Sequence, residues 1–138
     1  MSQSSIDTIR HCLLETMAVK FAYLFGSQAR QNTGPLSDVD IAVYIDKRHS
    51  PFSFRLLFQE KIDRLLKGKQ SCDLVILNNA ALTLQYEIIK DGKILKENKP
   101  KRIQFETDVL RKYLDMDQMR SVYMSALKRS FLKEPERG

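Results

Sequence analysis

The chain has 138 residues, 43% of them hydrophobic, which is enough for one hydrophobic core and too little for a second. It lacks the run of about 20 apolar residues that a bilayer-spanning helix needs, and its N-terminus lacks a secretory pattern, so we expect a cytoplasmic protein. Its net charge of +6 fits attraction to nucleotide phosphates, nucleic acid or an acidic protein and does not choose among them.

The positive charge lies outside the first third of the chain. Residues 1–46 carry three basic and five acidic side chains, whereas residues 47–98 and 99–138 each carry ten basic and six acidic ones. The two cysteines, Cys12 and Cys72, stand 60 positions apart without a metal-binding spacing, so we expect reduced packing residues.

The first predicted elements are a helix over the first twenty residues and a strand, VKFAYLF (19–25), that stops at Gly26. A short helix in SQARQ (27–31) and a loop in NTGPLS (32–37) follow. The second predicted strand is DVDIAVYI (38–45). The intervening loop is too short for a full crossover helix, so we expect these two strands to be antiparallel neighbours.

The second half of the chain continues the alternation after a break at HSPFS (49–53). We predict a helix ending near Gly68, a strand in SCDLVILN (71–78), a helix in LTLQYEIIKDG (82–92) and a short strand in KILKE (93–97). A long helix then begins at Pro100, and LDMDQ (114–118) is a candidate kink. The order predicts an α/β (α+β) fold with a small mixed sheet, helices packed on one face and a long C-terminal helix. We expect one domain over 1–132 and a disordered tail over 133–138.

An Asp-x-Asp pair occupies the second predicted strand. Because strand side chains alternate, Asp38 and Asp40 share one face, while Val39, Ile41 and the next alternate residues form an apolar face. Two carboxylates about 7 Å apart repel each other unless a cation or a proton lies between them. Hard divalent cations such as Mg²⁺ bind such oxygen clusters, with substrate phosphates completing the shell.

A Gly-Ser pair precedes those aspartates by ten residues and suits a phosphate. Gly26 permits close backbone approach, and free N–H groups at the start of the following helix favour an anion. Ser27 adds a hydroxyl, and Arg30 follows one helical turn later. A third oxygen ligand is expected for two metal ions, and Asp73 at the start of the third strand fits that role and could take a proton from an attacking hydroxyl.

This pattern, Gly-Ser, about ten residues, Asp-x-Asp and a later strand carboxylate, resembles the nucleotidyltransferases of the DNA polymerase β superfamily. More closely, the chain is similar to the minimal nucleotidyltransferase (MNT, or MntA-type) antitoxins that pair with HEPN ribonuclease toxins. The similarity includes SCDLVILNNAALTLQYEIIKDGKILKE (71–97) and FETDVLRKYLDM (105–116) and covers essentially residues 15–125.

The resemblance implies the polymerase β-like palm fold and a division of roles. Asp38, Asp40 and Asp73 would coordinate two Mg²⁺ ions, while Gly26, Ser27 and Arg30 would engage the triphosphate of ATP. The family transfers AMP to a tyrosine of its HEPN partner, releases pyrophosphate and so silences the toxin. A heteromeric complex with a HEPN protein is therefore implied.

Two other functions stay open from the residues alone. The chain could neutralise a partner by occlusion, with a vestigial site, or it could nucleotidylate a small molecule, as aminoglycoside nucleotidyltransferases do. Against the second, 138 residues leave little beyond a nucleotide-binding core to build an acceptor pocket. The basic clusters at 98–102 and 128–133 fit solvated helix ends, so we do not expect a nucleic-acid partner.

Overall fold

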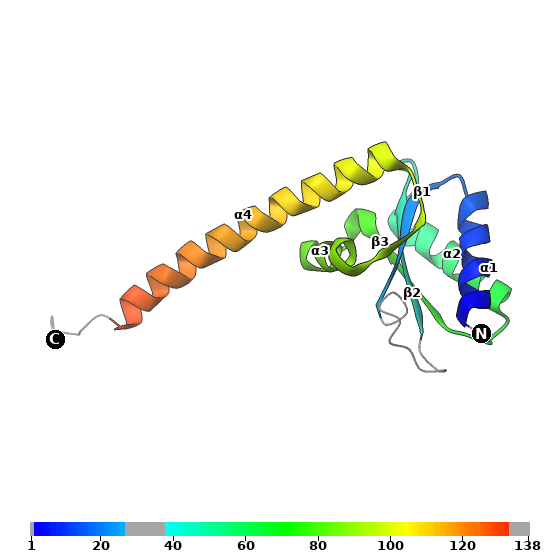
Figure 1. Ribbon diagram of the computed structural model, residues 1–138, viewed down its shortest axis with the longest axis horizontal. Helices are drawn as coiled ribbons and strands as arrows, with labels where there is room; N and C mark the ends of the chain where they lie inside the picture. Colours follow the sequence, from blue (N-terminus) through cyan, green and yellow to red (C-terminus); the bar gives the residue numbers. More distant parts are fainter. Residues whose placement is uncertain (1, 27–37, 133–138) are drawn as a thin grey trace.

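The computed structural model describes residues 2–26 and 38–132 (Figure 1). Every helix and strand predicted within those ranges is present in the predicted order, together with a short 3-10 turn that was not predicted. The expected helix at 27–31, the loop at 32–37 and the tail at 133–138 lie outside the described residues. The elements are α1 (Ser2–Glu15), β1 (Val19–Phe25), β2 (Val39–Ile45), α2 (Pro51–Leu66), β3 (Cys72–Ile76), η1 (Leu77–Asn79), α3 (Leu82–Asp91), β4 (Lys93–Lys96) and α4 (Lys99–Leu132).

The four strands form one mixed sheet in the order β3-β2-β1-β4. Strand β1 pairs antiparallel with both β2 and β4, which confirms the antiparallel prediction for the first two strands. Strand β3 pairs parallel with β2, and α2 supplies the crossover that a parallel connection requires. The N-terminal ends of β2 and β3 therefore lie beside the C-terminal end of β1, at one end of the sheet.

The main core lies between one face of the sheet and helices α1 and α2. Alternate residues of β2, from Val39 to Ile45, are fully buried in it, as the apolar face of the Asp-x-Asp strand predicted. Ile9 and Leu13 cover it from α1, and Ile62 covers it from α2. Cys12 and Cys72 are buried free thiols in the same core, which confirms their expected packing role.

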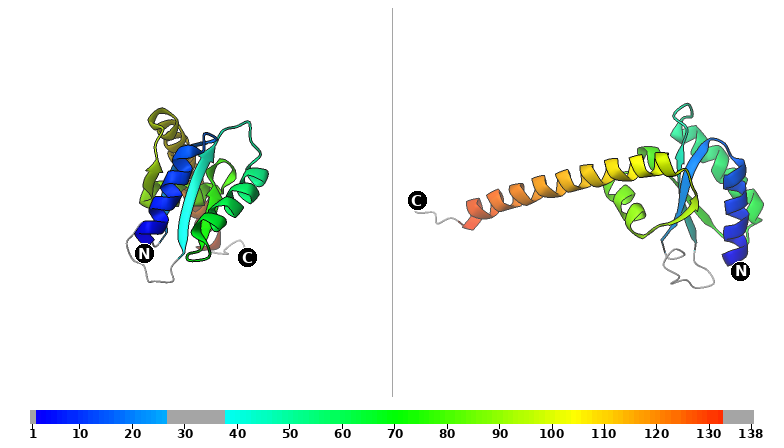
Figure 2. Two further views of the ribbon diagram at one scale, coloured as in Figure 1. Left: turned by 90° about the vertical axis from the view of Figure 1, so that its right-hand side faces the viewer. Right: turned by 45° about the horizontal axis from the view of Figure 1, so that its top comes forward.

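The opposite face of the sheet is also covered, so the prediction of helices on one face only was wrong. Phe21, Tyr23 and Ala42 point to this second face and are buried with Ile88 of α3, while Phe105 of α4 packs against them. The views in Figure 2 show α3 and α4 on the opposite side of the sheet from α1 and α2. The physical reason is that both alternating sets of β1 side chains are apolar, and a sheet that is apolar on both faces needs cover on both.

Helix α4 runs through the candidate kink at 114–118 as one helix of 34 residues. Its first half packs on α3 and β1, and its second half projects from the body (Figure 1). In the part of the chain that the structure describes, no helix, α4 included, is long and apolar enough to cross a membrane.

Helix α2 begins inside the segment in which we predicted a break. Ser50 is its N-cap and accepts a hydrogen bond from the backbone N–H of Ser53, and Pro51 occupies the first helical position. Proline is tolerated there because its missing N–H would have no partner within the helix.

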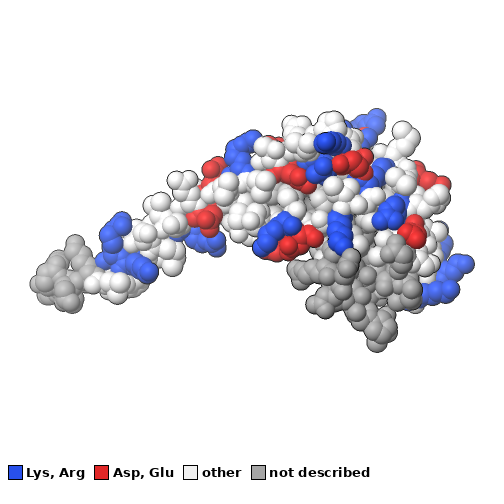
Figure 3. Space-filling model, in the orientation of Figure 1, with Lys and Arg blue, Asp and Glu red and all other residues white. Residues whose placement is uncertain are grey.

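The surface charge is mixed. On the face shown in Figure 3, basic and acidic side chains are interspersed, and they do not form the continuous basic stripe with which proteins bind a nucleic-acid backbone.

Candidate active site

Asp40 and Asp73 lie side by side on neighbouring strands. They are register partners in the parallel β2–β3 pair, and paired residues of adjacent strands point to the same face of a sheet. Asp38 immediately precedes β2 and is exposed. The third strand therefore runs beside the Asp-x-Asp strand, and Asp38 lies just before β2 at the same end of the sheet, where β1, β2 and β3 meet.

The electrostatics of Asp40 reflect this crowding. Partial burial raises the pKa of Asp40 above its ordinary value, and the neighbouring negative charges of Asp73 and Asp38 raise that pKa further. Each of these causes disfavours the charged form of the carboxyl group. A positive charge placed among the three groups would relieve the repulsion.

Gly26 forms the wall on the β1 side of Asp40. Phe25, the residue before it, is the β1 partner of Asp40, and Gly26 itself has a φ of +74°. A Cβ atom built at Gly26 would collide with Oδ2 of Asp40, so the carboxylate lies directly against the glycine backbone. Glycine is required here both for the left-handed conformation and for this close approach.

The donor set fits a hard divalent cation. Asp40 and Asp73 face the same way from adjacent strands, Asp38 stands next to them, and all three offer carboxylate oxygens. Among the described residues, no three acidic, histidine or cysteine side chains converge closely enough to form a ready-made cage. Mg²⁺ does not need such a cage, because it binds through one or two carboxylates, with water and substrate phosphates supplying the other ligands. Ser27 and Arg30 lie outside the described residues.

Two side chains of α2 that the sequence analysis missed hold the strand of Asp73. Arg55 donates from Nε to the carbonyl of Leu74 at 3.0 Å, and Gln59 donates from Nε2 to the carbonyl of Cys72 at 2.7 Å. These carbonyls belong to the open edge of β3, on both sides of Asp73 in the chain. Polar residues four apart on α2 were the available signal, but such spacing also describes any solvated helix face.

A groove of about 320 Å³ leads away from Asp73 along this edge. It runs between the first turn of α2, where Phe52 and Arg55 line it, and the start of α3, where Leu84 lines it. Phe52 is 72% exposed, an unusual state for a large aromatic side chain. The groove thus offers apolar surface and a guanidinium group next to a carboxylate.

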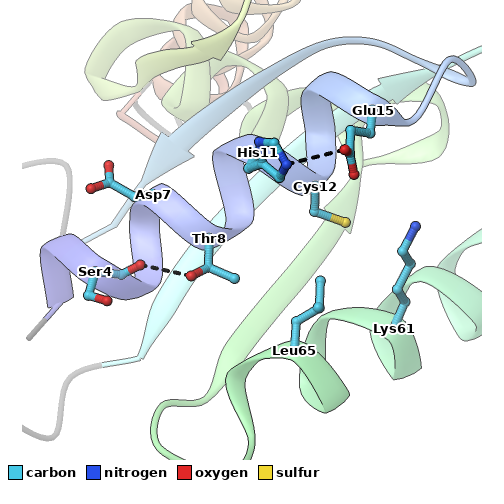
Figure 4. A pocket seen from close by; sticks show the side chains of 8 residues that line it. All are labelled: Ser4, Asp7, Thr8, His11, Cys12, Glu15, Lys61 and Leu65. Atoms are coloured by element: carbon cyan, nitrogen blue, oxygen red, sulfur yellow. Dashed lines mark hydrogen bonds and ion pairs between the residues drawn. The ribbon is translucent and has the colours of Figure 1, made fainter.

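A larger hollow of about 620 Å³ lies between α1 and α2, away from these carboxylates (Figure 4). Asp7, His11 and Glu15 line it from α1 and Lys61 lines it from α2. His11 lies 3.2 Å from Glu15 and its side chain is 74% exposed, as expected for a surface histidine. Because α1 and α2 cover the other face of the sheet, this hollow is not part of the carboxylate site.

Comparison with known proteins agrees with this geometry. The family described as polymerase beta, nucleotidyltransferase matches residues 7–101, more than half of the chain. Among proteins of curated function, none matches at a significant level.

Several solved structures share the fold. A chain of a toxin-antitoxin complex with AMP-PNP superposes with a TM-score of 0.73 at 23% identity, covering 88% of this chain and 97% of that one. A chain from tri-AMPylated Shewanella oneidensis HEPN toxin in complex with MNT antitoxin gives 0.68 at 23% identity, covering 92% and 98%. A chain of the toxin-antitoxin MntA-HepT gives 0.67 at 22% identity, covering 91% and 97%. The resemblance inferred from the motifs is confirmed, and the chain belongs to the polymerase beta nucleotidyltransferase family.

Proposed function

We propose that this protein is a Mg²⁺-dependent adenylyltransferase that transfers AMP from ATP to a tyrosine of a HEPN-domain toxin and thereby acts as its antitoxin. The observation that carries the proposal is the register pairing of Asp40 with Asp73 beside Gly26. Support comes from the solved structures of like fold, one holding AMP-PNP and another an AMPylated HEPN toxin with an MNT antitoxin.

We propose a role for each residue from its chemistry and its position in the sequence. Asp38, Asp40 and Asp73 would hold Mg²⁺, whose positive charge neutralises the phosphates and the charge that develops during transfer. Gly26, with Ser27 and Arg30 after it, would bind the triphosphate through backbone N–H groups, a hydroxyl and a guanidinium group. Catalysis would then consist of positioning and charge neutralisation, and it would need no covalent enzyme intermediate.

The transfer needs no reactant besides ATP and the tyrosine. The tyrosine oxygen attacks the α-phosphorus of ATP, and the bond between that phosphorus and the oxygen leading to the β-phosphate breaks. Pyrophosphate leaves with the bonding electrons, and Asp73 accepts the proton of the tyrosine hydroxyl. The groove beside Asp73 would receive the acceptor ring, for which Phe52 and Leu84 offer an apolar surface.

The test is transfer of α-labelled ATP to a co-purified HEPN partner. We expect Asp38→Asn and Asp40→Asn each to lower the labelling rate by roughly a hundredfold or more, because each removes a charged ligand from the site. Asp115→Asn is the matched control, since Asp115 is exposed on α4, and it should label the partner at the normal rate.

Equal labelling by wild type and by both site variants would refute the catalytic role of these aspartates. Survival of toxin-expressing cells with the double variant Asp38→Asn/Asp40→Asn, at normal protein levels, would instead favour neutralisation by occlusion.

A further inference from the structure

Helix α4 carries a regular apolar seam along its length. From residue 109 onward its members alternate in steps of four and three, the heptad spacing of helices that pack against each other. We call these residues the α4 seam: Val109, Tyr113, Met116, Arg120, Tyr123 and Leu127. All except Arg120 are large and apolar or aromatic.

The first half of the α4 seam is covered by the body of the protein. Val109 is only 3% exposed, and the ring of Tyr113 stacks on Tyr86 of α3 with centroids 3.8 Å apart and planes 1° from parallel. The seam is therefore a packing surface where a neighbour exists. We therefore expect the continuation of the seam, along the same face of the helix, to pack against a neighbour as well.

The second half of the α4 seam projects into solvent with the helix (Figure 1). Tyr123 is 64% exposed, and next to the seam Met119 is 72% exposed and Phe131 is 81% exposed. In water an isolated helical segment gains little stability from propensity alone, and contiguous apolar surface of this kind marks an interaction site. The partner should be a helix, because heptad spacing matches helix-on-helix packing.

Charges beside the seam identify that helix. Asp117 and Lys128 are 11 residues apart, about three helical turns, so they lie on the same flank of the seam. In an antiparallel pair related by a twofold axis, each flank faces the same flank of the partner, whereas in a parallel pair it faces the opposite one. A second copy centred on Tyr123 would place Asp117 against Lys128 twice, once on each side of the axis.

We propose that the projecting half of α4 pairs antiparallel with α4 of a second copy of this chain, through the α4 seam. The two Tyr123 rings meet at the centre, Arg120 lies beside the aromatic ring of the opposite Tyr123, and two Asp117–Lys128 pairs flank them. Within one chain Asp117 already accepts a hydrogen bond from Arg120 at 3.1 Å, and this leaves its second carboxylate oxygen for Lys128. The bodies lie at opposite ends of the pair, with both carboxylate sites free of the interface.

The first test measures the mass of the full-length chain by sedimentation over a range of concentrations, without partner protein. We expect a dimer at tens of micromolar for wild type and a monomer for Tyr123→Asp, because a carboxylate would be buried at the centre of the seam. Val122→Asp is the matched control: Val122 has the same 64% exposure but lies off the seam, so this variant should stay dimeric.

The second test is charge reversal across the twofold axis. Asp117→Lys and Lys128→Asp should each weaken dimerisation roughly tenfold, because each creates two like-charge contacts, and the double reversal should restore it. A wild type that is monomeric throughout, equal effects of the Tyr123 and Val122 variants, or a double reversal no better than the single ones would each overturn the proposal. A monomer that needs Tyr123 to co-purify with its HEPN partner would assign the seam to that protein instead.

Discussion

At the scale of single residues, the site depends on one contact between a glycine and a carboxylate. Oδ2 of Asp40 occupies the space that a side chain at Gly26 would take, so the end of β1 and the carboxylate strand fit together only with glycine at this position. The Gly-Ser pair predicted close backbone approach at Gly26, but it did not predict this contact, which depends on the β1–β2 register. Asp73 was likewise predicted by type and strand position, and only the parallel pairing places it beside Asp40.

Gly26→Ala should lower the rate of AMP transfer, and Gly68→Ala provides the control. Both glycines have positive φ, +74° and +73°, so both substitutions cost about 1 kcal/mol of backbone strain. Only at Gly26 does the new methyl group collide with Asp40, whereas nothing lies within 4 Å at Gly68. We expect labelling by Gly26→Ala to fall more than tenfold, with similar losses in free energy of unfolding for the two variants. Equal labelling would show that Asp40 can move away without cost.

Asp40→Asn should make the protein more stable near neutral pH while removing its activity. The folded-state pKa of Asp40 is raised, so its contribution to stability is fully present below the ordinary aspartate pKa and is lost as pH rises through the raised value. Removing the charge should increase the free energy of unfolding by about 0.5 to 1 kcal/mol, the size of a like-charge contact across strands. Urea unfolding without Mg²⁺ or nucleotide, from acidic to neutral pH, should show the two proteins converging at low pH. If the variant were more stable than wild type by the same amount at every pH, the charge of Asp40 would not be the cause of the difference.

At the scale of elements, the sequence predicted strands and helices well because their apolar periodicities are strong. The Asp-x-Asp strand alternates cleanly, and its apolar side is buried in the main core as predicted. The cover of the sheet was predicted wrongly because β1 has apolar residues on both faces, and strand alternation alone does not say which helices cover them. The edge of β3 shows the same limit, since Arg55 and Gln59 reach its carbonyls from 13 to 19 residues away. These two hydrogen bonds leave fewer free backbone carbonyl groups on the outer edge of β3 for another strand to pair with.

At the scale of the whole molecule, α4 has two parts. Residues 99–116, which we call the root, pack on the body, and residues 117–132, which we call the arm, project from it. At the root, Tyr23 donates to Glu106 at 2.5 Å, and Arg102 bridges Glu106 to Glu97. Burial and the hydrogen bond to Glu106 raise the pKa of Tyr23 far above its ordinary value, so its hydroxyl remains a donor throughout the usual pH range. Phe105 packs against Phe21 with ring centroids 5.6 Å apart. Between residues 117 and 132 the side chains are exposed, apart from the half-buried Leu127.

This division predicts that changing the arm affects stability much less than changing the root. Deleting residues 117–138 should alter the free energy of unfolding by no more than about 0.5 kcal/mol at concentrations where the protein is monomeric, because the side chains of 117–132 are exposed, apart from Leu127, and exposed side chains contribute little. Phe105→Ala should cost about 2 to 3 kcal/mol, because it removes an aromatic ring from the packing on the second face of the sheet. Chemical denaturation monitored by circular dichroism measures both, and Ser125→Ala on the exposed arm serves as a neutral substitution. A truncated chain that unfolds as readily as Phe105→Ala would mean that the arm supports the body, and the second half of α4 would then be a folding element instead of a free surface.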